Sequence, residues 1–221
     1  MNDLDVVVLG GGGHVGLPLS LAFADAGLRV GIYDTSQATL DQIAAGEMPF
    51  RENGADELLA RILPTGRLEL SASGEILERT DQVVVVIGTP VDEFLGPSMT
   101  VFERAVGQIA PHLRRGALVV LRSTVYPGTT AYVAQHLAVR GLDVDLAFCP
   151  ERIAEGHALE ELRSLPQIVG ADTEAATVRA TALFGTLAAE TIHTSTKEAE
   201  LAKLFTNTWR YMKFGSRTSS S

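Results

Sequence analysis

A run of glycines between two regular segments constrains the fold of this chain more than any other feature of its sequence. Residues 11–16, Gly-Gly-Gly-His-Val-Gly, fit the pattern G-x-G-x-x-G directly after a β-branched, strand-like segment, 5–10. In this context Gly11 permits a tight turn, Gly13 lets a pyrophosphate approach the backbone, and Gly16 allows a helix to pack closely on the strand. Successive glycines also occur in plain flexible turns, but the strand–turn–helix context favours a dinucleotide-binding unit.

Asp34 provides a carboxylate at the position where a dinucleotide-binding unit binds the ribose of its cofactor. Asp34 ends the second predicted strand, roughly 20 residues beyond the glycines. A carboxylate at this point binds the ribose hydroxyls of NAD and repels the 2′-phosphate of NADP, and no arginine immediately follows it to reverse that preference. The other interpretation of Asp34 is an N-cap of the next helix. Position and spacing together favour NAD as the cofactor.

Strand-like and helix-like patterns alternate along the chain, which predicts an α/β fold. Strands are predicted at residues 5–10, 29–33, 82–87, 117–121, 145–148, 167–169 and 191–193, and helices at 15–26, 37–45, 55–63, 100–109, 129–140, 171–189 and 197–214. Such an order forms a Rossmann-like, doubly wound parallel sheet with helices on both faces. We expect an NAD-binding domain at 1–195, the start of a long connecting helix at 196–214, and a disordered tail or cloning remnant at 215–221.

Charge and cysteine content exclude several classes of protein. The chain has 18 Lys and Arg against 27 Asp and Glu, a net charge of −9, so a nucleic-acid partner is not expected. Its one cysteine, Cys149, cannot form an internal disulfide, which favours a reducing cytoplasm. The first residues contain neither a basic segment nor a long apolar stretch, so neither a signal peptide nor a membrane partner is expected.

Hydroxyl-bearing residues follow two further predicted strands. The segment 88–92, with Thr89, follows the strand at 82–87, and the segment 123–129, with Thr124, follows the strand at 117–121. Ligands of open parallel sheets bind beyond the carboxyl ends of the strands, so both hydroxyls are expected near the cofactor. Ordinary turns rich in Pro and Gly have the same composition, and each segment taken alone allows that interpretation.

Five segments, taken in order, resemble the nucleotide-sugar 6-dehydrogenases, the UDP-glucose/GDP-mannose dehydrogenase family. They are GGGHVGLP, IGTPVDE, RSTVYPGTT, FCPERIAEG and KEAELAKLFTNTWRYMKF, and the resemblance covers residues 5–214. The PER form and NTWRYMKF are most similar to the UDP-N-acetylmannosamine dehydrogenase branch. The resemblance implies an enzyme of polysaccharide biosynthesis that oxidises the C6 alcohol of a UDP-sugar to the uronic acid. It implies two NAD per sugar, and a thiohemiacetal and a thioester on an enzyme cysteine.

The resemblance also implies site residues. For the cofactor these are His14, Val15, Asp34, Thr89, Thr124 and Glu155, which join Gly11, Gly13 and Gly16 of the glycine pattern. For the substrate they are Glu151, Arg152, Ile153, Lys203, Asn207 and Arg210. The implied catalytic residues are Lys203, Asn207, Glu151 and Thr124, with Lys203 beside the reacting hydroxyl and Glu151 in thioester hydrolysis. Thr39, where the family often has a basic residue, and His14, where Tyr is common, depart from the pattern and are expected to weaken or reshape cofactor binding.

The last predicted helix carries a polar stripe. At about 100° per residue, Lys203, Asn207 and Arg210 fall within about 60° of one another. An apolar group lies on the opposite side, where we expect the core contact: Leu201, Leu204, Phe205, Thr208 and Met212. Periodicity alone favours a solvated face for the polar stripe, whereas the family motifs favour a substrate-binding face. A lysine near a hydroxyl under oxidation can stabilise developing alkoxide charge.

Cys149 does not match the family's nucleophile. That cysteine lies further along, in a glycine-rich segment that these 221 residues do not contain. We therefore predict that Cys149 is a small, buried apolar residue. The histidines show no ligand spacing, so no metal is expected.

These expectations describe the N-terminal, NAD-binding part of a nucleotide-sugar dehydrogenase, inactive alone. The full-length form is expected to be a homodimer through its central helix. Two alternatives stay open from the sequence. One is a non-catalytic NAD-binding or interaction module. The other is a Rossmann dehydrogenase of the 3-hydroxyacyl-CoA or 6-phosphogluconate type, against which STVYPGTT followed by CPERIAEG argues.

Overall fold

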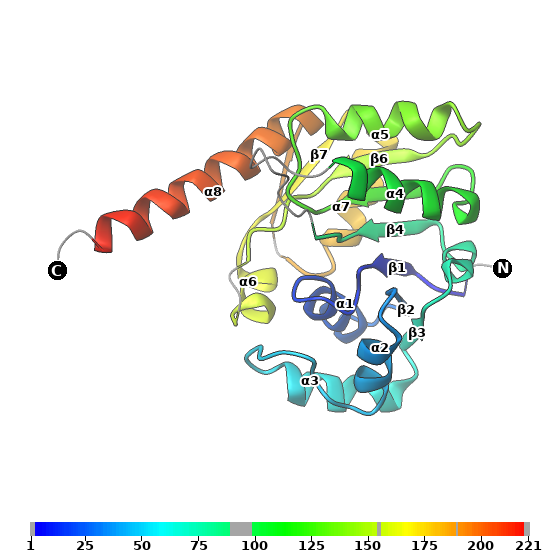
Figure 1. The fold of residues 1–221 in the computed structure, drawn as a ribbon, viewed down its shortest axis with the longest axis vertical. Coiled ribbons are helices and arrows are strands. Elements are labelled where there is room, and N and C mark those ends of the chain that lie inside the picture. Colours follow the sequence, from blue (N-terminus) through cyan, green and yellow to red (C-terminus); the bar gives the residue numbers. More distant parts are fainter. Residues whose placement is uncertain (1–2, 89–98, 154–155, 189, 219–221) are drawn as a thin grey trace.

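The computed structural model describes residues 3–88, 99–153, 156–188 and 190–218, although the side chains of 99–101 and 210–218 are not described (Figure 1). Strands and helices alternate through these residues. In chain order they are β1 (Val6–Leu9), α1 (Gly16–Asp25), β2 (Val30–Tyr33), α2 (Gln37–Ala44), α3 (Ala55–Ile62), β3 (Leu68–Ser71), β4 (Gln82–Val85), α4 (Met99–Ile109), β5 (Leu118–Leu121), α5 (Thr129–Ala138), β6 (Asp145–Phe148), α6 (Ala158–Ser164), β7 (Gln167–Ala171), α7 (Glu174–Phe184), β8 (Thr191–Thr194) and α8 (Thr196–Thr218). Short 3₁₀ helices occur at Leu63–Thr65, Gly74–Arg79 and Ala110–His112.

The described strands form one sheet in the order β3-β2-β1-β4-β5-β6-β7-β8. Neighbouring strands are parallel except for β6 and β7. The chain builds the sheet outward from β1 in one direction and then, from β4, in the other. The order therefore reverses between β1 and β4, and a ligand-binding crevice is expected beyond the carboxyl ends of these two strands.

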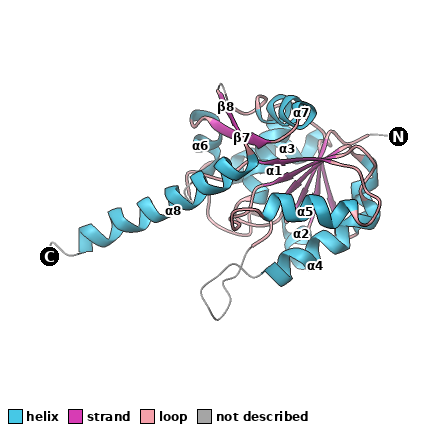
Figure 2. Ribbon diagram, turned by 90° about the horizontal axis from the view of Figure 1, so that it is seen from above, coloured by secondary structure: helices cyan, strands magenta, loops and turns pink. Residues whose placement is uncertain are grey.

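Helices cover both faces of this sheet, as the sequence predicts. One core packs α1, α2, α3, α6 and α7 against alternate strand residues such as Val8, Ile32 and Val120. The other core packs α4 and α5 against the intervening strand residues, which face the opposite side of the sheet, such as Leu9 and Leu121. Figure 2 shows the two layers, with α4 and α5 on one side of the strands and α1 and α7 on the other. Strands buried on both faces explain the continuous apolar runs in β1, β4 and β5.

The predicted fold class is confirmed, and each predicted strand is present. The structure differs from the prediction at three elements. Strand β3 and helix α6 were not predicted, because one is a half-buried edge strand and the other has only 7 residues. Strand β7 pairs antiparallel with β6, so the expectation of a purely parallel sheet is wrong there. A parallel neighbour requires a connection that returns along the sheet, whereas α6 packs against α1 and the chain enters β7 in the direction opposite to β6.

Helix α8 leaves the body of the protein and carries the chain to its C-terminal end (Figures 1 and 2). It is continuous to Thr218, so residues 215–218 are helical where the sequence analysis expects a disordered tail. Gly170 on β7 allows its first turns to approach, because a Cβ there would lie 2.5 Å from the Cβ of Ala199. None of the described helices is long and apolar enough to span a bilayer.

The face of α8 that contacts the sheet is opposite to the one that its periodicity predicts. Ala199, Glu200 and Lys203 are buried, whereas Leu201 is 36% and Phe205 is 71% exposed. The expectation that the apolar side forms the core contact is therefore wrong. Both buried charges have partners on other elements, described below, and helical periodicity contains no information about such partners.

Candidate functional site

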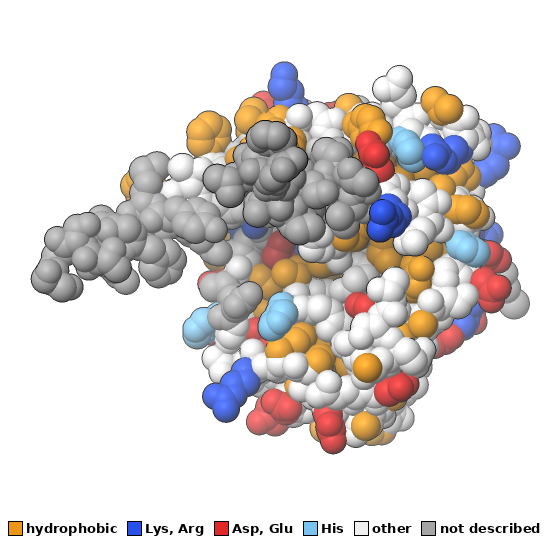
Figure 3. Space-filling model, in the orientation of Figure 1, with side chains coloured by type: hydrophobic (Ala, Val, Ile, Leu, Met, Phe, Trp, Pro, Cys, Tyr) orange, Lys and Arg blue, Asp and Glu red, His pale blue; other side chains and the backbone are white. Residues whose placement is uncertain are grey.

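Two adjoining cavities lie at the carboxyl ends of β1, β4 and β5, where the strand order reverses. They have volumes of about 460 and 350 Å³ and share a common wall, formed by Gly10, Gly13, Val86, Ile87 and Gly88. The first extends toward Thr124, Glu151 and Lys203, and the second toward Asp34. In Figure 3 this face is hollowed at mid-height, between the part that carries α1–α3 and the part that carries α4 and α5.

The glycine turn at the common wall is made by Gly10, whose φ is 75°. A Cβ on Gly10 would lie 1.8 Å from the carbonyl oxygen of Val86, so only glycine fits. Gly11 lies within the same turn, which the N–H of Gly13 closes by donating to the carbonyl oxygen of Gly10 at 3.2 Å, and it also packs closely, since its Cβ would lie 2.8 Å from Ile32 Cγ2. Gly16 has the expected packing role, with its Cβ position only 2.2 Å from the carbonyl oxygen of Gly10.

Gly13 differs from Gly11 and Gly12 because a Cβ at this position would not collide with other protein atoms. The nearest atom to a Cβ on Gly13 would be the carbonyl oxygen of Gly10, at 3.5 Å, which is an ordinary contact. Gly13 borders both cavities, so its missing side chain leaves room for a ligand rather than for protein. Helix α1 begins here without a side-chain cap, and its N-terminal turn offers N–H groups and a positive dipole end to an anion.

Asp34 lies at the end of β2 and lines the second cavity. Its Oδ2 accepts a hydrogen bond from the N–H of Gly12, and its Oδ1 accepts one from the N–H of Ser36, both at 3.0 Å. The N-cap of α2 is Ser36, whose Oγ accepts from the N–H of Thr39, so the alternative of Asp34 as the cap does not hold. The carboxylate instead ties the glycine turn to the end of β2, at the border of the cavity.

His14 borders the first cavity together with Val15 and Gly16. Its imidazole stacks on the ring of Phe50, with 4.1 Å between the ring centroids. Phe50 belongs to the loop between α2 and α3, so this loop reaches the start of α1. His14 thus joins two segments beside the position where an anion would bind.

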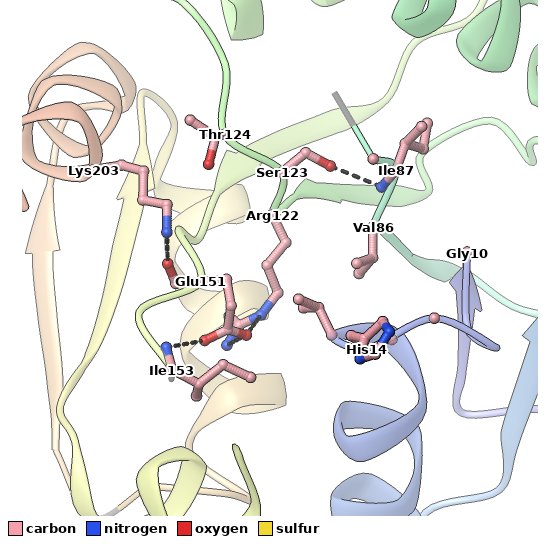
Figure 4. Close-up of a pocket in the computed structure, with 14 residues that line it drawn as sticks. Gly10, His14, Val86, Ile87, Arg122, Ser123, Thr124, Glu151, Ile153 and Lys203 are labelled. Carbon is pink, nitrogen blue, oxygen red and sulfur yellow. Dashed lines mark hydrogen bonds and ion pairs between the residues drawn. The ribbon is translucent and has the colours of Figure 1, made fainter. Parts of the chain in front are cut away.

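A buried ion pair forms the floor of the first cavity. Arg122 directly follows β5, and its Nε donates to Oε2 of Glu151 at 2.7 Å (Figure 4). Oε1 of Glu151 accepts from the N–H groups of Arg152 and Ile153, at 2.6 and 2.9 Å. Arg122 also donates to the Cys149 carbonyl oxygen. The pair therefore holds the loop that follows β6 against the end of β5.

Lys203 brings α8 to the same cavity. Its Nζ donates to the carbonyl oxygen of Glu151, and its side chain lies among the residues that line the cavity, with Thr124 nearby (Figure 4). Lys203 is only 9% exposed. The cavity thus unites the glycine turn, the ends of β5 and β6, and α8, as the sequence analysis expects for Thr124, Glu151, Ile153 and Lys203.

Two of the expected substrate-binding residues lie outside the two cavities. Arg152 is half-buried and donates to the carbonyl oxygen of Pro166, and neither it nor the half-buried Asn207 is among the described residues that line the cavities. Thr89, Glu155 and the side chain of Arg210 lie outside the described residues.

Four buried polar residues around the site were not singled out from the sequence. Arg122 is one, and a charged residue directly after an apolar strand is a usable signal, because it needs a buried partner. Ser123 Oγ accepts from the N–H of Ile87 at 2.8 Å. Glu52 accepts from the N–H groups of Gly156 and Ala158 at the start of α6, at 2.9 and 2.7 Å. Glu200, on α8, is the fourth.

Cys149 is fully buried, as predicted, within the core that contains α1 and α7. Burial raises the pKa of its thiol to about 12, although the nearby charge of Arg122 acts in the opposite direction. A thiol with so high a pKa does not form a thiolate near neutral pH. Among the side chains that the structure describes, no three His, Cys, Asp or Glu are grouped to hold a metal ion.

Comparison with known proteins agrees with this geometry. Residues 5–188 match the NAD binding domain of the UDP-glucose/GDP-mannose dehydrogenase family. UDP-N-acetyl-D-mannosamine dehydrogenase of Pyrococcus horikoshii is 32% identical over 204 residues, which are 90% of this chain and 49% of that protein.

Solved structures give the same result. That of UDP-D-ManNAc dehydrogenase from Pyrococcus horikoshii superposes with a TM-score of 0.88 at 31% identity, covering 94% of this chain and 50% of that one. GDP-mannose dehydrogenase from Pseudomonas aeruginosa also has a TM-score of 0.88, at 25% identity, covering 97% of this chain and 51% of that one. The chain spans about half the length of the relatives that it matches.

Proposed function

Because the chain belongs to the UDP-glucose/GDP-mannose dehydrogenase family, we propose that it binds NAD across the two cavities as the N-terminal part of a nucleotide-sugar dehydrogenase. The observation that carries the proposal is the first cavity, where the glycine turn of a dinucleotide site and a buried lysine on α8 meet. In the proposed reaction the C6 alcohol of a UDP-sugar is oxidised to the uronic acid. The relatives' names make UDP-N-acetylmannosamine the first sugar to test.

The residues present fit NAD. Asp34 supplies a carboxylate for ribose hydroxyls at the end of the second strand, and the start of α1 supplies N–H groups for the pyrophosphate. The space beside Gly13 lets the pyrophosphate approach the backbone. The adenosine half then belongs to the second cavity and the nicotinamide half to the first. When bound there, NAD accepts the hydride that leaves the sugar carbon.

On the substrate side, Lys203 holds a positive charge at a water-poor edge of the first cavity. A cation preorganised in this way stabilises an alkoxide that develops on a sugar oxygen. The carboxylate of Glu151 is engaged by Arg122 and by two N–H groups, so it could take a proton from water only by releasing one of these donors. In the observed arrangement, Glu151 orders the loop that carries Ile153. Asn207, Arg152, Arg210, Thr89 and Glu155 keep the roles that the family resemblance implies for them, as part of this proposal.

We assign the protein to the cytoplasm and to polysaccharide biosynthesis as part of the same proposal. A homodimer that packs through α8 is supported by the exposed apolar side of that helix, where Phe205 is 71% exposed. Two such helices would remove this surface from water.

The test is a calorimetric titration of the chain with NADH, NADPH and UDP-N-acetylmannosamine, followed by mass analysis of products formed with NAD. We expect NADH to bind more tightly than NADPH. Absence of NADH binding would contradict the proposal. Binding of NADH with no interaction with any UDP-sugar would favour a non-catalytic NAD-binding module instead.

A further inference from the structure

Glu200 on α8 is a buried carboxylate beside the site, and it is only 1% exposed. Its Oε2 accepts from the N–H of Gly128 at 2.6 Å. Its Oε1 accepts from the N–H and the Oγ1 of Thr130, at 2.8 and 2.7 Å. Three charge-assisted hydrogen bonds therefore offset the cost of burying this charge.

The three donors belong to the N-terminus of α5. Gly128 is the N-cap of this helix, with a φ of 95°, and as a glycine it has no side chain to satisfy the first N–H groups. Glu200 supplies the missing cap from a distant part of the chain. Its negative charge also lies at the positive end of the dipole of α5, where it is stabilising.

This contact fixes the segment 123–128 at its second end. At the first end, Ser123 Oγ accepts from the N–H of Ile87 and so ties the segment to the chain after β4. At the second end, Gly128 is tied to Glu200. Between the two ties lies Thr124, which lines the first cavity. The segment that carries Thr124 is thus held at both of its ends.

The same contact fixes Lys203. Glu200 and Lys203 are three residues apart on the buried face of α8, so they lie on one side of consecutive turns. Glu200 bonds to the start of α5, and Lys203 bonds to the Glu151 carbonyl oxygen in the loop after β6. Helix α8 is therefore attached across the ends of two neighbouring strands, β5 and β6.

We infer that Glu200 is a positioning residue, which sets Thr124 and Lys203 relative to each other and so shapes the first cavity. The second cavity, with Asp34, has no part in this arrangement. The inference rests on the proposed function, because it assigns the nicotinamide half of NAD to the first cavity and the adenosine half to the second. Loss of the Glu200 charge therefore affects the two halves of the cofactor differently.

The experiment compares NADH with ADP-ribose, which lacks the nicotinamide ring, by calorimetric titration of the wild-type chain and of Glu200→Gln. A glutamine of the same size provides one acceptor oxygen and no charge. We expect NADH to bind at least about tenfold more weakly to Glu200→Gln, because charge-assisted bonds are lost. The affinity for ADP-ribose stays within about twofold, and its binding shows that the variant is folded.

Two further variants sharpen the test. Glu198→Gln is the matched control, since Glu198 is on the same helix and, among the described residues, its carboxylate accepts from Thr194 and Ser195 just before the helix, and it should leave both affinities unchanged. Thr130→Val removes one donor to Glu200 at nearly constant volume, and it should weaken NADH binding by about threefold without affecting ADP-ribose.

The outcomes separate the inference from the proposed function. Unchanged NADH affinity in Glu200→Gln, or an equal loss of NADH and ADP-ribose affinity, would overturn the positioning role while leaving the proposed function standing. A wild-type chain that binds neither NADH nor ADP-ribose would overturn the proposed function, and the inference with it.

Discussion

Arg122 contacts a single carboxylate oxygen of Glu151, Oε2: its Nε donates to that oxygen at 2.7 Å, and its Nη2 lies 2.6 Å from it in the ion pair. The Arg122 side chain is 0% and the Glu151 side chain 9% exposed, so the pair is shielded from water. Because one residue follows β5 and the other follows β6, their contact joins two strand ends at the floor of the first cavity. The arrangement of the loop that carries Ile153 depends on this pair.

Removal of one partner should be far more damaging than removal of both. Arg122→Met leaves the Glu151 carboxylate buried without its cation, and we expect a loss of about 3–5 kcal/mol in the free energy of unfolding. The double variant Arg122→Met/Glu151→Met replaces the pair by apolar groups and should recover much of that loss. Urea denaturation measures both values, and equal losses in the single and double variants would contradict the prediction.

Alanine at two neighbouring glycines should affect different properties: at Gly13 it should weaken NADH binding, and at Gly16 it should lower the free energy of unfolding. Gly13→Ala meets only an ordinary 3.5 Å contact, so the free energy of unfolding should change by less than about 1 kcal/mol. Its methyl group enters the cavity, and NADH affinity should fall more than about tenfold. Gly16→Ala places a methyl group 2.2 Å from the carbonyl oxygen of Gly10, and should cost about 3 kcal/mol or more.

Thermal unfolding and NADH titration of the two variants distinguish these effects. The position next to the cavity should affect binding with the fold intact, and the packing position should affect the fold itself. A Gly13→Ala variant that binds NADH like the wild type would show that the pyrophosphate does not approach the turn.

Asp34→Asn should narrow the preference for NAD over NADP. The carboxylate repels a 2′-phosphate and accepts from ribose hydroxyls more strongly than a neutral amide. The measurement is the ratio of NADH to NADPH affinity in the wild type and the variant, with Asp41→Asn as a control at an exposed carboxylate on α2 that bonds to Gln37. An unchanged ratio in Asp34→Asn would refute the assignment of Asp34 to the ribose.

Low pH should decrease the free energy of unfolding, in part through protonation of Asp25. Hydrogen bonds from Arg61 on α3 lower the pKa of Asp25 despite its partial burial, and Arg163 on α6 adds to the effect. Because the pKa in the folded state lies below the value of 3.8 for an unperturbed aspartate, the stabilisation is complete above that pH. It is lost as the pH falls through the folded-state pKa.

The corresponding variant is Asp25→Asn. Its deficit in the free energy of unfolding should be constant from neutral pH down to roughly pH 5 and should shrink below roughly pH 4. Asp143→Asn, at an exposed carboxylate outside the described ion pairs, should show no such pH-dependent deficit. A deficit of Asp25→Asn that grows with acidity would have the wrong sign for this mechanism.

Much of the fold could be predicted because its signals are local. The apolar runs of β1, β4 and β5, the glycine turn and the boundaries of α1 depend on neighbouring residues and on the periods of strand and helix. Strand β3 carries a weak signal since it is half-buried, and the direction of β7 depends on the path of the chain through α6. Neither property is a matter of local periodicity.

By itself, the sequence determined the alternating strands and helices, the dinucleotide-type turn and the carboxylate at the end of β2, because each depends on backbone freedom or on spacing within a few residues. Only the tertiary structure decided which face of α8 is buried and where the charges of Arg122, Glu151, Glu200 and Lys203 find partners. The physical reason is that a charge is buried only where distant segments supply its hydrogen-bond partners. On α8, periodicity alone places Lys203 in water, whereas folding buries it at the edge of the first cavity.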